Sequence, residues 1–211
     1  MQTQLIKINP DHPAVSILKK AAAIIKKGGV VVLPTDTVYG LVCDATNPET
    51  VKKLYQIKKR PLSQPLSIAL SDLSYIYKYV ESYSDLAEKL AKKLLPGPLT
   101  IVLKKSSLIP DIVTAGRSDI GIRIPDSKIV LKLIELVQRP IVIPSANIHN
   151  RPSPTTAQQA LKDLNGKVDL ILDGGKTKYG VESTIVSFIN DEIKILREGA
   201  ISTEEILACI N

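Results

Sequence analysis

The chain has 211 residues, of which 44% are hydrophobic and 23% charged, and its formal net charge is +7. This length fits one domain that buries a sizeable core without disulfide bridges. The two cysteines form no CxxC pair, and the two histidines lie far apart without metal-ligand spacing, which disfavours structural zinc and a Ser-His-Asp triad. Residues 1–13 contain no apolar signal segment, and no run approaches the length of a membrane span. We therefore expect neither secretion nor membrane insertion, but a cytoplasmic location.

The excess of positive charge indicates affinity for anions without identifying the anion. Nucleotides, RNA and acidic surfaces all remain open. Much of the excess comes from lysine pairs in helical runs, which usually form solvated faces: Lys19-Lys20, Lys26-Lys27 and Lys92-Lys93. The charge permits a binding function but does not define one.

Hydrophobic periodicity predicts alternating strands and helices in the first part of the chain. Residues 5–8 are typical of a short strand. Apolar residues recur at helical spacing from Val15 to Ile25, and Gly28-Gly29 ends that helix. Residues 30–33 form the next apolar strand. The Thr35-Asp36-Thr37 segment after it is also typical of a simple strand-to-helix turn.

A first polar cluster lies at the end of the next predicted helix. Asn47-Pro48-Glu49 has the pattern of a helix N-terminus, and apolar residues recur at helical spacing until Pro61 stops the helix. Lys58 and Arg60 therefore lie at the helix C-terminus. A cation there also has a purely structural use, because it offsets the helix dipole by about 0.3 to 1 kcal/mol.

A second polar cluster follows an apolar, β-branched strand that begins at Pro140. Ser145, Ala146 and Asn147 leave the carboxyl end of this strand, which is where ligands bind in open α/β sheets. An ordinary turn would use the same residue types. Together with Lys58 and Arg60, however, these side chains predict a polyphosphate site.

The remaining segments continue the alternation and complete the predicted fold. We expect strands over residues 67–70, 99–103, 120–124, 168–172, 184–188 and 193–196, and helices over residues 85–95, 128–137 and 156–164, with a last helix after a Ser202/Glu205 capping box. A hairpin-like pair around Asn190-Asp191 favours a mixed sheet. The sequence predicts an α/β fold: one domain over residues 1–211, with a twisted sheet of parallel and antiparallel strands flanked by helices.

Several sequence blocks carry a resemblance to a known family. Besides Lys58-x-Arg60 and Ser145-x-Asn147, the chain contains, in order, Pro34-Thr-Asp-Thr-Val-Tyr-Gly-Leu41, Leu95-Pro-Gly-Pro-Leu-Thr100, Gly121-Ile-Arg-Ile-Pro125 and Gly180-Val-Glu-Ser-Thr184. The ordered set, which extends from about Gly28 to Gly199, resembles the YrdC-like family of threonylcarbamoyl-AMP synthases in its single-domain form. Longer relatives append a C-terminal domain, and we expect none here.

The resemblance implies a reaction. L-Threonine, bicarbonate and ATP condense to threonylcarbamoyl-AMP with release of pyrophosphate, and the adenylate feeds the threonylcarbamoyl modification of the tRNA adenosine next to the anticodon. It implies ATP as substrate, accompanied by Mg²⁺ without a dedicated protein cage. The implied partners are tRNA and the downstream threonylcarbamoyl-transfer proteins, and we expect neither DNA nor membrane among them.

The resemblance also implies roles for individual residues. The expected ATP-binding residues are Lys58, Arg60, Gln64, Ser145, Asn147 and Arg197, of which Lys58 and Arg60 are also expected to be catalytic. The expected threonine-binding residues are Thr37, Tyr39, Arg123 and Ser183. No metal-binding residue is implied.

Some of these residues also have simpler explanations. Arg123 alternates with isoleucines and would point to solvent on a half-buried strand, and Arg197-Glu198 has the pattern of a surface ion pair. Ala69, Gln64 and Asp119 depart from the family pattern, which leaves open how threonine is contacted. Residues 174–182, rich in Gly and Lys, are a candidate lid over a labile adenylate.

Three other functions are open at this stage. An RNA-binding module would fit the basic charge, although the chain is only 4% aromatic and base stacking uses aromatic side chains. A paralogue that uses another carbamoyl substrate would keep the same fold. A non-catalytic assembly or ribosome-associated factor is the third alternative.

Overall fold

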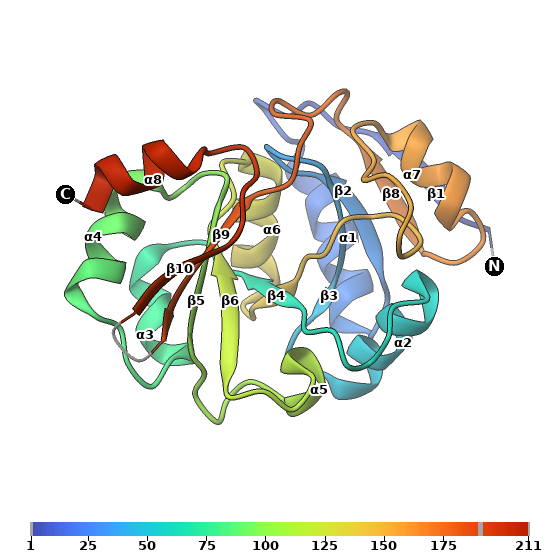
Figure 1. Ribbon diagram of the computed structural model, residues 1–211. Coiled ribbons are helices and arrows are strands. Elements are labelled where there is room, and N and C mark those ends of the chain that lie inside the picture. The colour runs from blue at the N-terminus through green and yellow to red at the C-terminus, as the bar shows by residue number, and fades with distance from the viewer. Residues whose placement is uncertain (1, 190–191, 211) are drawn as a thin grey trace.

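The computed structural model describes residues 2–189 and 192–210 (Figure 1). Its strands are β1 Gln4–Lys7, β2 Val31–Pro34, β3 Tyr39–Asp44, β4 Ser67–Ala69, β5 Leu99–Lys104, β6 Asp119–Arg123, β7 Ile141–Val142, β8 Leu170–Asp173, β9 Thr184–Ile189 and β10 Glu192–Arg197. Its helices are α1 Val15–Lys26, α2 Pro48–Lys58, α3 Ile76–Tyr79, α4 Asp85–Leu94, α5 Asp111–Thr114, α6 Lys128–Val137, α7 Ala157–Leu164 and α8 Thr203–Ile210, and a 3₁₀ turn covers Leu73–Tyr75.

The described strands form one sheet in the order β1-β8-β2-β3-β7-β4-β6-β5-β9-β10. The parallel pairs are β1 with β8, β8 with β2, β4 with β6 and β5 with β9, and the other neighbouring pairs are antiparallel. The predicted α/β fold with a mixed sheet is confirmed. Asn190 and Asp191 lie outside the described residues, but the flanking strands β9 and β10 pair antiparallel, as the hairpin pattern predicted.

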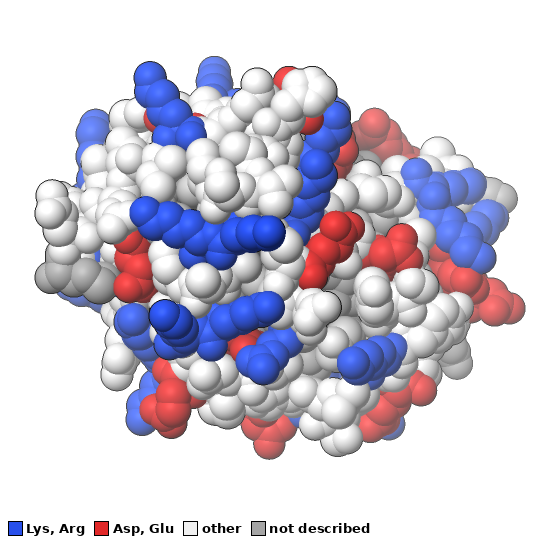
Figure 2. Space-filling model, turned by 180° about the vertical axis from the view of Figure 1, so that it is seen from behind, with Lys and Arg blue, Asp and Glu red and all other residues white. Residues whose placement is uncertain are grey.

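Two hydrophobic cores lie on opposite faces of the sheet. On β2, Val31 and Leu33 contact the core that α1 and α6 cover, whereas Val32 belongs to the core on the other face. Figure 2, the view from behind, shows Lys and Arg side chains gathered on the face of the molecule that α1 and α6 cover. The lysine pairs Lys19-Lys20 and Lys26-Lys27 of α1 are indeed exposed.

Capping residues set the helix ends as the sequence indicated. The Asn47 side chain accepts hydrogen bonds from the backbone N–H groups of Glu49 (3.1 Å) and Thr50 (3.2 Å), and Lys59 ends α2 in the left-handed conformation with φ 52°. Ser202 and Glu205 form the predicted reciprocal cap of α8. The end of α2 is therefore fixed in space, and the backbone sets the position of Lys58, the last residue of the helix.

The alternative of a simple strand-to-helix turn after β2 is wrong. Residues 35–38 instead join β2 to β3 as an antiparallel hairpin, with Pro34 opposite Tyr39. The Thr35 hydroxyl closes the turn by donating to the carbonyl of Val38 at 2.7 Å. All of β3 is buried, so it lacks the polar alternation that reveals a half-buried strand.

In the described part of the chain, no helix combines the length and the apolar character needed to cross a membrane.

The central strands should carry much of the stability. Ile68 on β4 is fully buried between β6 and β7, so Ile68→Ala should lower the free energy of unfolding by about 2 to 5 kcal/mol. Urea denaturation measures this change. Leu108→Ala, at a side chain that is 52% exposed, is the control and should change stability by no more than about 0.5 kcal/mol. A loss at Ile68 no larger than the control's would contradict the expectation.

Candidate functional site

The two polar clusters found in the sequence meet at one buried ammonium group. Lys58 Nζ donates to the carbonyl of Ser145 (2.5 Å), the carbonyl of Asn147 (3.0 Å) and Asn147 Oδ1 (2.8 Å), and it lies 3.3 Å from Ser145 Oγ. Lys58 is only 2% exposed. The alternative in which Lys58 only offsets the helix dipole does not account for these bonds, because the side chain joins α2 to the loop after β7.

Burial is the largest influence on the charge of Lys58. The pKa of Lys58 is lowered to about 8, chiefly by burial and also by the nearby Arg60 guanidinium, while Glu182 and Asp163 act in the opposite direction. Four oxygen atoms surround an ammonium that has three protons to donate. The lysine is thus held by the protein, and its most direct effect is to position Ser145 and Asn147.

Beside this group lies a cavity of about 310 Å³ between the sheet and the loops above it. The predicted site residues that line it are Thr37, Arg60, Arg123, Ser145, Ser183 and Arg197. The predicted residues placed outside its lining are Lys58, Asn147, Gln64 and Tyr39. The predicted site residues therefore lie in one region of the structure, where some line the cavity and others support the lining.

Arg60 is held by the loop that follows α2. Its Nε donates to the carbonyl of Gln64 at 3.2 Å and its Nη2 to the carbonyl of Pro65 at 2.9 Å. Burial lowers the pKa of Arg60, but an arginine stays charged at every physiological pH. Gln64 also accepts a hydrogen bond from the Tyr55 hydroxyl through the same carbonyl, at 2.8 Å. Gln64 therefore contributes its backbone to the site by orienting Arg60.

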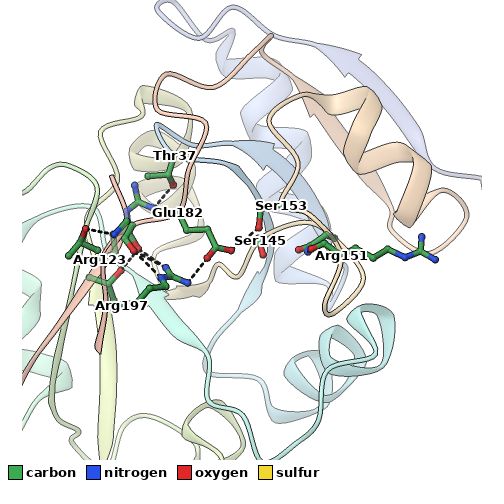
Figure 3. Close-up of polar contacts among 12 residues, drawn as sticks. Thr37, Arg123, Ser145, Arg151, Ser153, Glu182 and Arg197 are labelled. Carbon is green, nitrogen blue, oxygen red and sulfur yellow. Dashed lines mark hydrogen bonds and ion pairs between the residues drawn. The ribbon is translucent and has the colours of Figure 1, made fainter. Parts of the chain in front are cut away.

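A second guanidinium, that of Arg123, lines one end of the cavity, and Figure 3 shows its contact with Thr37. Its Nη1 donates to Thr37 Oγ1 (2.7 Å), its Nη2 to Asp36 Oδ1 (2.6 Å) and its Nε to the carbonyl of Gly97 (3.1 Å). Arg123 is 7% exposed, so the alternative in which it points to solvent is wrong. Three of its five N–H groups are engaged, which leaves two free to bind a ligand.

The buried partner of Arg123 was missed by sequence reasoning. Asp36 lies inside the Pro34–Leu41 block, and its side chain is fully buried. Asp36 Oδ1 receives the arginine, whereas no donor within the described residues reaches Asp36 Oδ2. A fixed carboxylate beneath a guanidinium holds that guanidinium in one orientation.

A hydroxyl pair and a third arginine form the adjacent wall. Ser183 Oγ lies 2.8 Å from Thr100 Oγ1 and 3.3 Å from Arg197 Nη2. Arg197 also donates to the Ser183 carbonyl from Nε (3.1 Å) and Nη2 (2.9 Å). The cavity wall is therefore a connected hydrogen-bond network.

The ion pair of Arg197 differs from the one that the sequence suggested. Arg197 Nη1 donates to Glu182 Oε2 at 2.6 Å, and Glu182 Oε1 accepts from Ser153 Oγ at 2.7 Å (Figure 3). Glu198 instead accepts hydrogen bonds from Thr203. Sequence reasoning chose the adjacent acid, because nothing in the chain signals an ion pair across fifteen residues.

A β-bulge aims Arg197 into the cavity. On β10, Ile195 lies opposite Val186, but Arg197 rather than Leu196 lies opposite Ile185. Leu196 is thus an extra residue, and Leu196 and Arg197 both line the cavity although they are consecutive. The bulge places an apolar and a cationic side chain side by side.

The Gly- and Lys-rich segment 174–182 is tied to the same end of the cavity. Tyr179 and Gly180 donate backbone hydrogen bonds to the carbonyls of Asp36 (2.9 Å) and Thr37 (3.0 Å). Tyr39, fully buried, donates from its hydroxyl to the carbonyl of Gly175 at 2.6 Å, and burial raises its pKa to about 12. Tyr39 thus anchors the segment instead of lining the cavity.

The departures from the family pattern all have clear positions, and the Gln64 carbonyl is the one bound to Arg60. Ala69 is buried on β4, opposite Arg123 of β6 and Ile141 of β7. Asp119 lines the cavity, where both its oxygens accept from Arg117, Oδ1 from Nε at 2.8 Å and Oδ2 from Nη2 at 3.0 Å. The site residues that sequence reasoning missed are Asp36, Thr100, Arg117, Ser153 and Glu182.

Comparison with known proteins identifies the family of the chain. A family model for Sua5, YciO and YrdC proteins, described as "Telomere recombination", covers residues 23–199. The chain belongs to this family. As a member of the Sua5/YciO/YrdC family, it is 42% identical over 189 residues to the threonylcarbamoyl-AMP synthase of Pyrococcus abyssi, an alignment that covers 90% of this chain and 56% of that protein. The chain thus spans little more than half the length of that relative.

Two further relatives extend the comparison. A putative threonylcarbamoyl-AMP synthase of Methanocaldococcus jannaschii is 43% identical over 195 residues, which cover 90% of this chain and 91% of the relative. The crystal structure of P. abyssi Sua5 complexed with L-threonine superposes with a TM-score of 0.96 at 39% identity, over 99% of this chain and 61% of that one. The predicted family is confirmed.

The lowered pKa of Lys58 makes a prediction about stability. Between about pH 8 and the ordinary lysine value of 10.5, the unfolded state binds more protons than the folded state, so stability rises with pH over this window. The free energy of unfolding of the native protein, minus that of Lys58→Met, should therefore increase by up to about 1.4 kcal/mol per pH unit above pH 8. Denaturant titrations of both proteins at several pH values measure it, and a flat or falling difference would contradict it.

Proposed function

We propose that this chain is an L-threonylcarbamoyladenylate synthase, a nucleotidyltransferase that condenses L-threonine, bicarbonate and ATP to threonylcarbamoyl-AMP and pyrophosphate. The observation that carries the proposal is a single cavity that is lined by Arg123 at one end and by Arg60 and Arg197 along the adjoining wall, called here the cationic wall. Support also comes from the relatives named as threonylcarbamoyl-AMP synthases and from the Sua5 complex with L-threonine.

The Arg123 end suits the amino acid. The free N–H groups of Arg123 would bind the threonine carboxylate as a fork, since guanidinium and carboxylate geometries match. Thr37 and Ser183 place hydroxyl groups on either side, where they would bind the polar atoms of threonine. Tyr39 would act on this end indirectly, by anchoring segment 174–182 beside Thr37.

The adjoining wall suits the phosphates. The amine of threonine and carbon dioxide or bicarbonate give a carbamate, whose oxygen bonds to the α-phosphorus while the bond to pyrophosphate breaks. Negative charge then grows on the phosphoryl oxygens and on the leaving group, and fixed positive charge stabilises that transition state. Arg60 and Arg197 line the cavity there and would supply this charge.

Lys58, Ser145 and Asn147 form the third part of the proposed site. Ser145 lines the cavity and would donate to a phosphate oxygen. Lys58 would contribute its charge at short range and keep the Ser145 and Asn147 backbone in place. Gln64 would orient Arg60 through its carbonyl.

We further propose that Mg²⁺ enters with the phosphates of ATP, because this ion usually keeps several waters and binds through substrate phosphates. Within residues 2–189 and 192–210, no group of His, Cys, Asp or Glu side chains could by itself hold a metal ion. The proposed product is consumed by proteins that transfer the threonylcarbamoyl group to tRNA.

The direct test is pyrophosphate release from ATP and bicarbonate, with L-threonine, with L-serine and without an amino acid. Release that depends on L-threonine supports the proposal. Release that is independent of the amino acid would point instead to another carbamoyl or nucleotide substrate. The absence of release would favour a binding function.

Arg60 should contribute to the chemical step itself. We expect Arg60→Ala to lower kcat for pyrophosphate release by about 10² to 10³, the usual loss when one preorganised charge-stabilising group is removed. Steady-state kinetics measure this, and circular dichroism checks folding. Near-normal turnover in a folded variant would contradict the assigned role.

Arg123 should affect threonine more than ATP. Arg123→Lys keeps a charge beside Asp36 but loses the fork, so the KM for threonine should rise at least tenfold while ATP affinity stays within about twofold. Arg139→Lys is the matched control, because Arg139 also pairs with a buried carboxylate, Asp44, at 2.7 Å, but lies outside the cavity lining. Equal effects of the two substitutions on threonine would contradict the assignment.

A further inference from the structure

The cavity extends along strand β6 well beyond the Arg123 end. Asp119, Gly121 and Arg123 alternate with the buried residues Ile120 and Ile122, and all three line the cavity. Because a strand rises about 3.3 Å per residue, Asp119 and Arg123 are roughly 13 Å apart. That span accommodates most of an extended aminoacyl nucleotide, with its amino acid at one end and its nucleoside at the other.

Gly121 lies midway between Asp119 and Arg123 on β6 and has no side chain of its own. A Cβ atom at Gly121 would lie 2.5 Å from Ser67 Oγ on one neighbouring strand and 3.2 Å from Thr100 Cγ2 on the other. Both neighbours are closer than side chains normally tolerate. The side chains of Ser67 and Thr100 therefore cover the glycine, and the floor between the two ends carries only these small polar side chains, over which a phosphate or a sugar can pass.

Charged side chains are distributed unevenly along the cavity. The acidic side chains among the described lining residues are Glu182 and Asp119. Glu182 is paired with Arg197 at the cationic wall, whereas Asp119 lies at the far end. Arg117, which also lines the cavity, pairs with Asp119 and leaves this end close to neutral, whereas the other wall is cationic. The Asp119 end therefore suits an uncharged group that carries hydrogen-bond donors for the carboxylate.

The Asp119 carboxylate is fixed and still has acceptor capacity. Arg117 binds both of its oxygens at 2.8 and 3.0 Å, and the Asp119 side chain remains 18% exposed. Each carboxylate oxygen can accept a second hydrogen bond. Val102 and Leu196 supply apolar surface in the same cavity, which suits the face of a base.

We propose that Asp119, held by Arg117, accepts hydrogen bonds from the 2′ and 3′ hydroxyls of the ATP ribose and thereby selects ribonucleotides. This inference rests on the proposed function, because it takes ATP as the substrate of the cavity. A carboxylate that binds ribose hydroxyls is a known solution in dinucleotide-binding folds. Asp119 thus determines which nucleoside the protein accepts, whereas other residues bind the phosphates and threonine.

The experiment compares ATP, 2′-deoxy-ATP and 3′-deoxy-ATP by calorimetric binding and by threonine-dependent pyrophosphate release. The native protein should bind each deoxynucleotide about tenfold to a hundredfold more weakly than ATP, as expected for the loss of a hydrogen bond to a charged group. Asp119→Ala should bind all three nucleotides within about threefold of one another. Asp119→Asn provides a second, isosteric variant that should show reduced selectivity, and thermal unfolding confirms that both are folded.

Asp111→Asn is the matched control. Asp111 pairs with Lys105 at 2.7 Å on the surface and lies outside the cavity lining, so this variant should select as the native protein does. A native protein that uses ATP and both deoxynucleotides equally would overturn the ribose assignment alone. Asp119 variants that still prefer ATP over the deoxynucleotides as strongly as the native protein would also overturn the ribose assignment. An equal loss of affinity for all three nucleotides would overturn it as well. A native protein that neither binds ATP nor releases pyrophosphate would instead overturn the proposed function.

Discussion

The site depends on one buried cation that joins two distant parts of the chain. Lys58 concludes α2, and its ammonium group reaches the backbone of the loop that follows β7, eighty-seven to eighty-nine residues later. Backbone hydrogen bonds also hold this loop, from Ala146 to the carbonyl of Tyr39 and from His149 to the carbonyl of Lys58, and the ammonium group adds side-chain contacts that fix Ser145 and Asn147 relative to α2. The cost of burying the charge appears in the lowered pKa of Lys58, and the benefit is a rigid wall next to the cavity.

The other cations of the site are positioned by the same means. Arg123 is held by Asp36, Thr37 and a backbone carbonyl, and it retains two N–H groups for a ligand. Arg197 is held by Glu182 and by the carbonyl and hydroxyl of Ser183, and it retains one. Fixed donors need little reorganisation when charge develops on a substrate. The positive net charge of the chain matters less than these few side chains, because many lysines are simply exposed on the helical faces.

Much of the fold was predictable because its signals are local. The Asn47 cap, the stop after Lys58 and the amphipathic helices follow from neighbouring residues. Strand β3 was missed because burial on both faces removes the alternating pattern. Within the site, the motifs identified which residues gather, but not their roles. Those roles depend on contacts between segments far apart in the sequence. Lys58 holds the loop after β7, Tyr39 holds segment 174–182, and Arg197 pairs with Glu182.

The bulge on β10 also limits how this chain can vary in length. Leu196 is the one residue by which β10 exceeds its partner strand between Ile195 and Arg197. Deleting it would restore a regular ladder, and insertion of another residue before Arg197 would turn the guanidinium to the opposite face of the sheet. The number of residues between the start of β10 and Arg197 therefore decides whether the guanidinium faces the cavity.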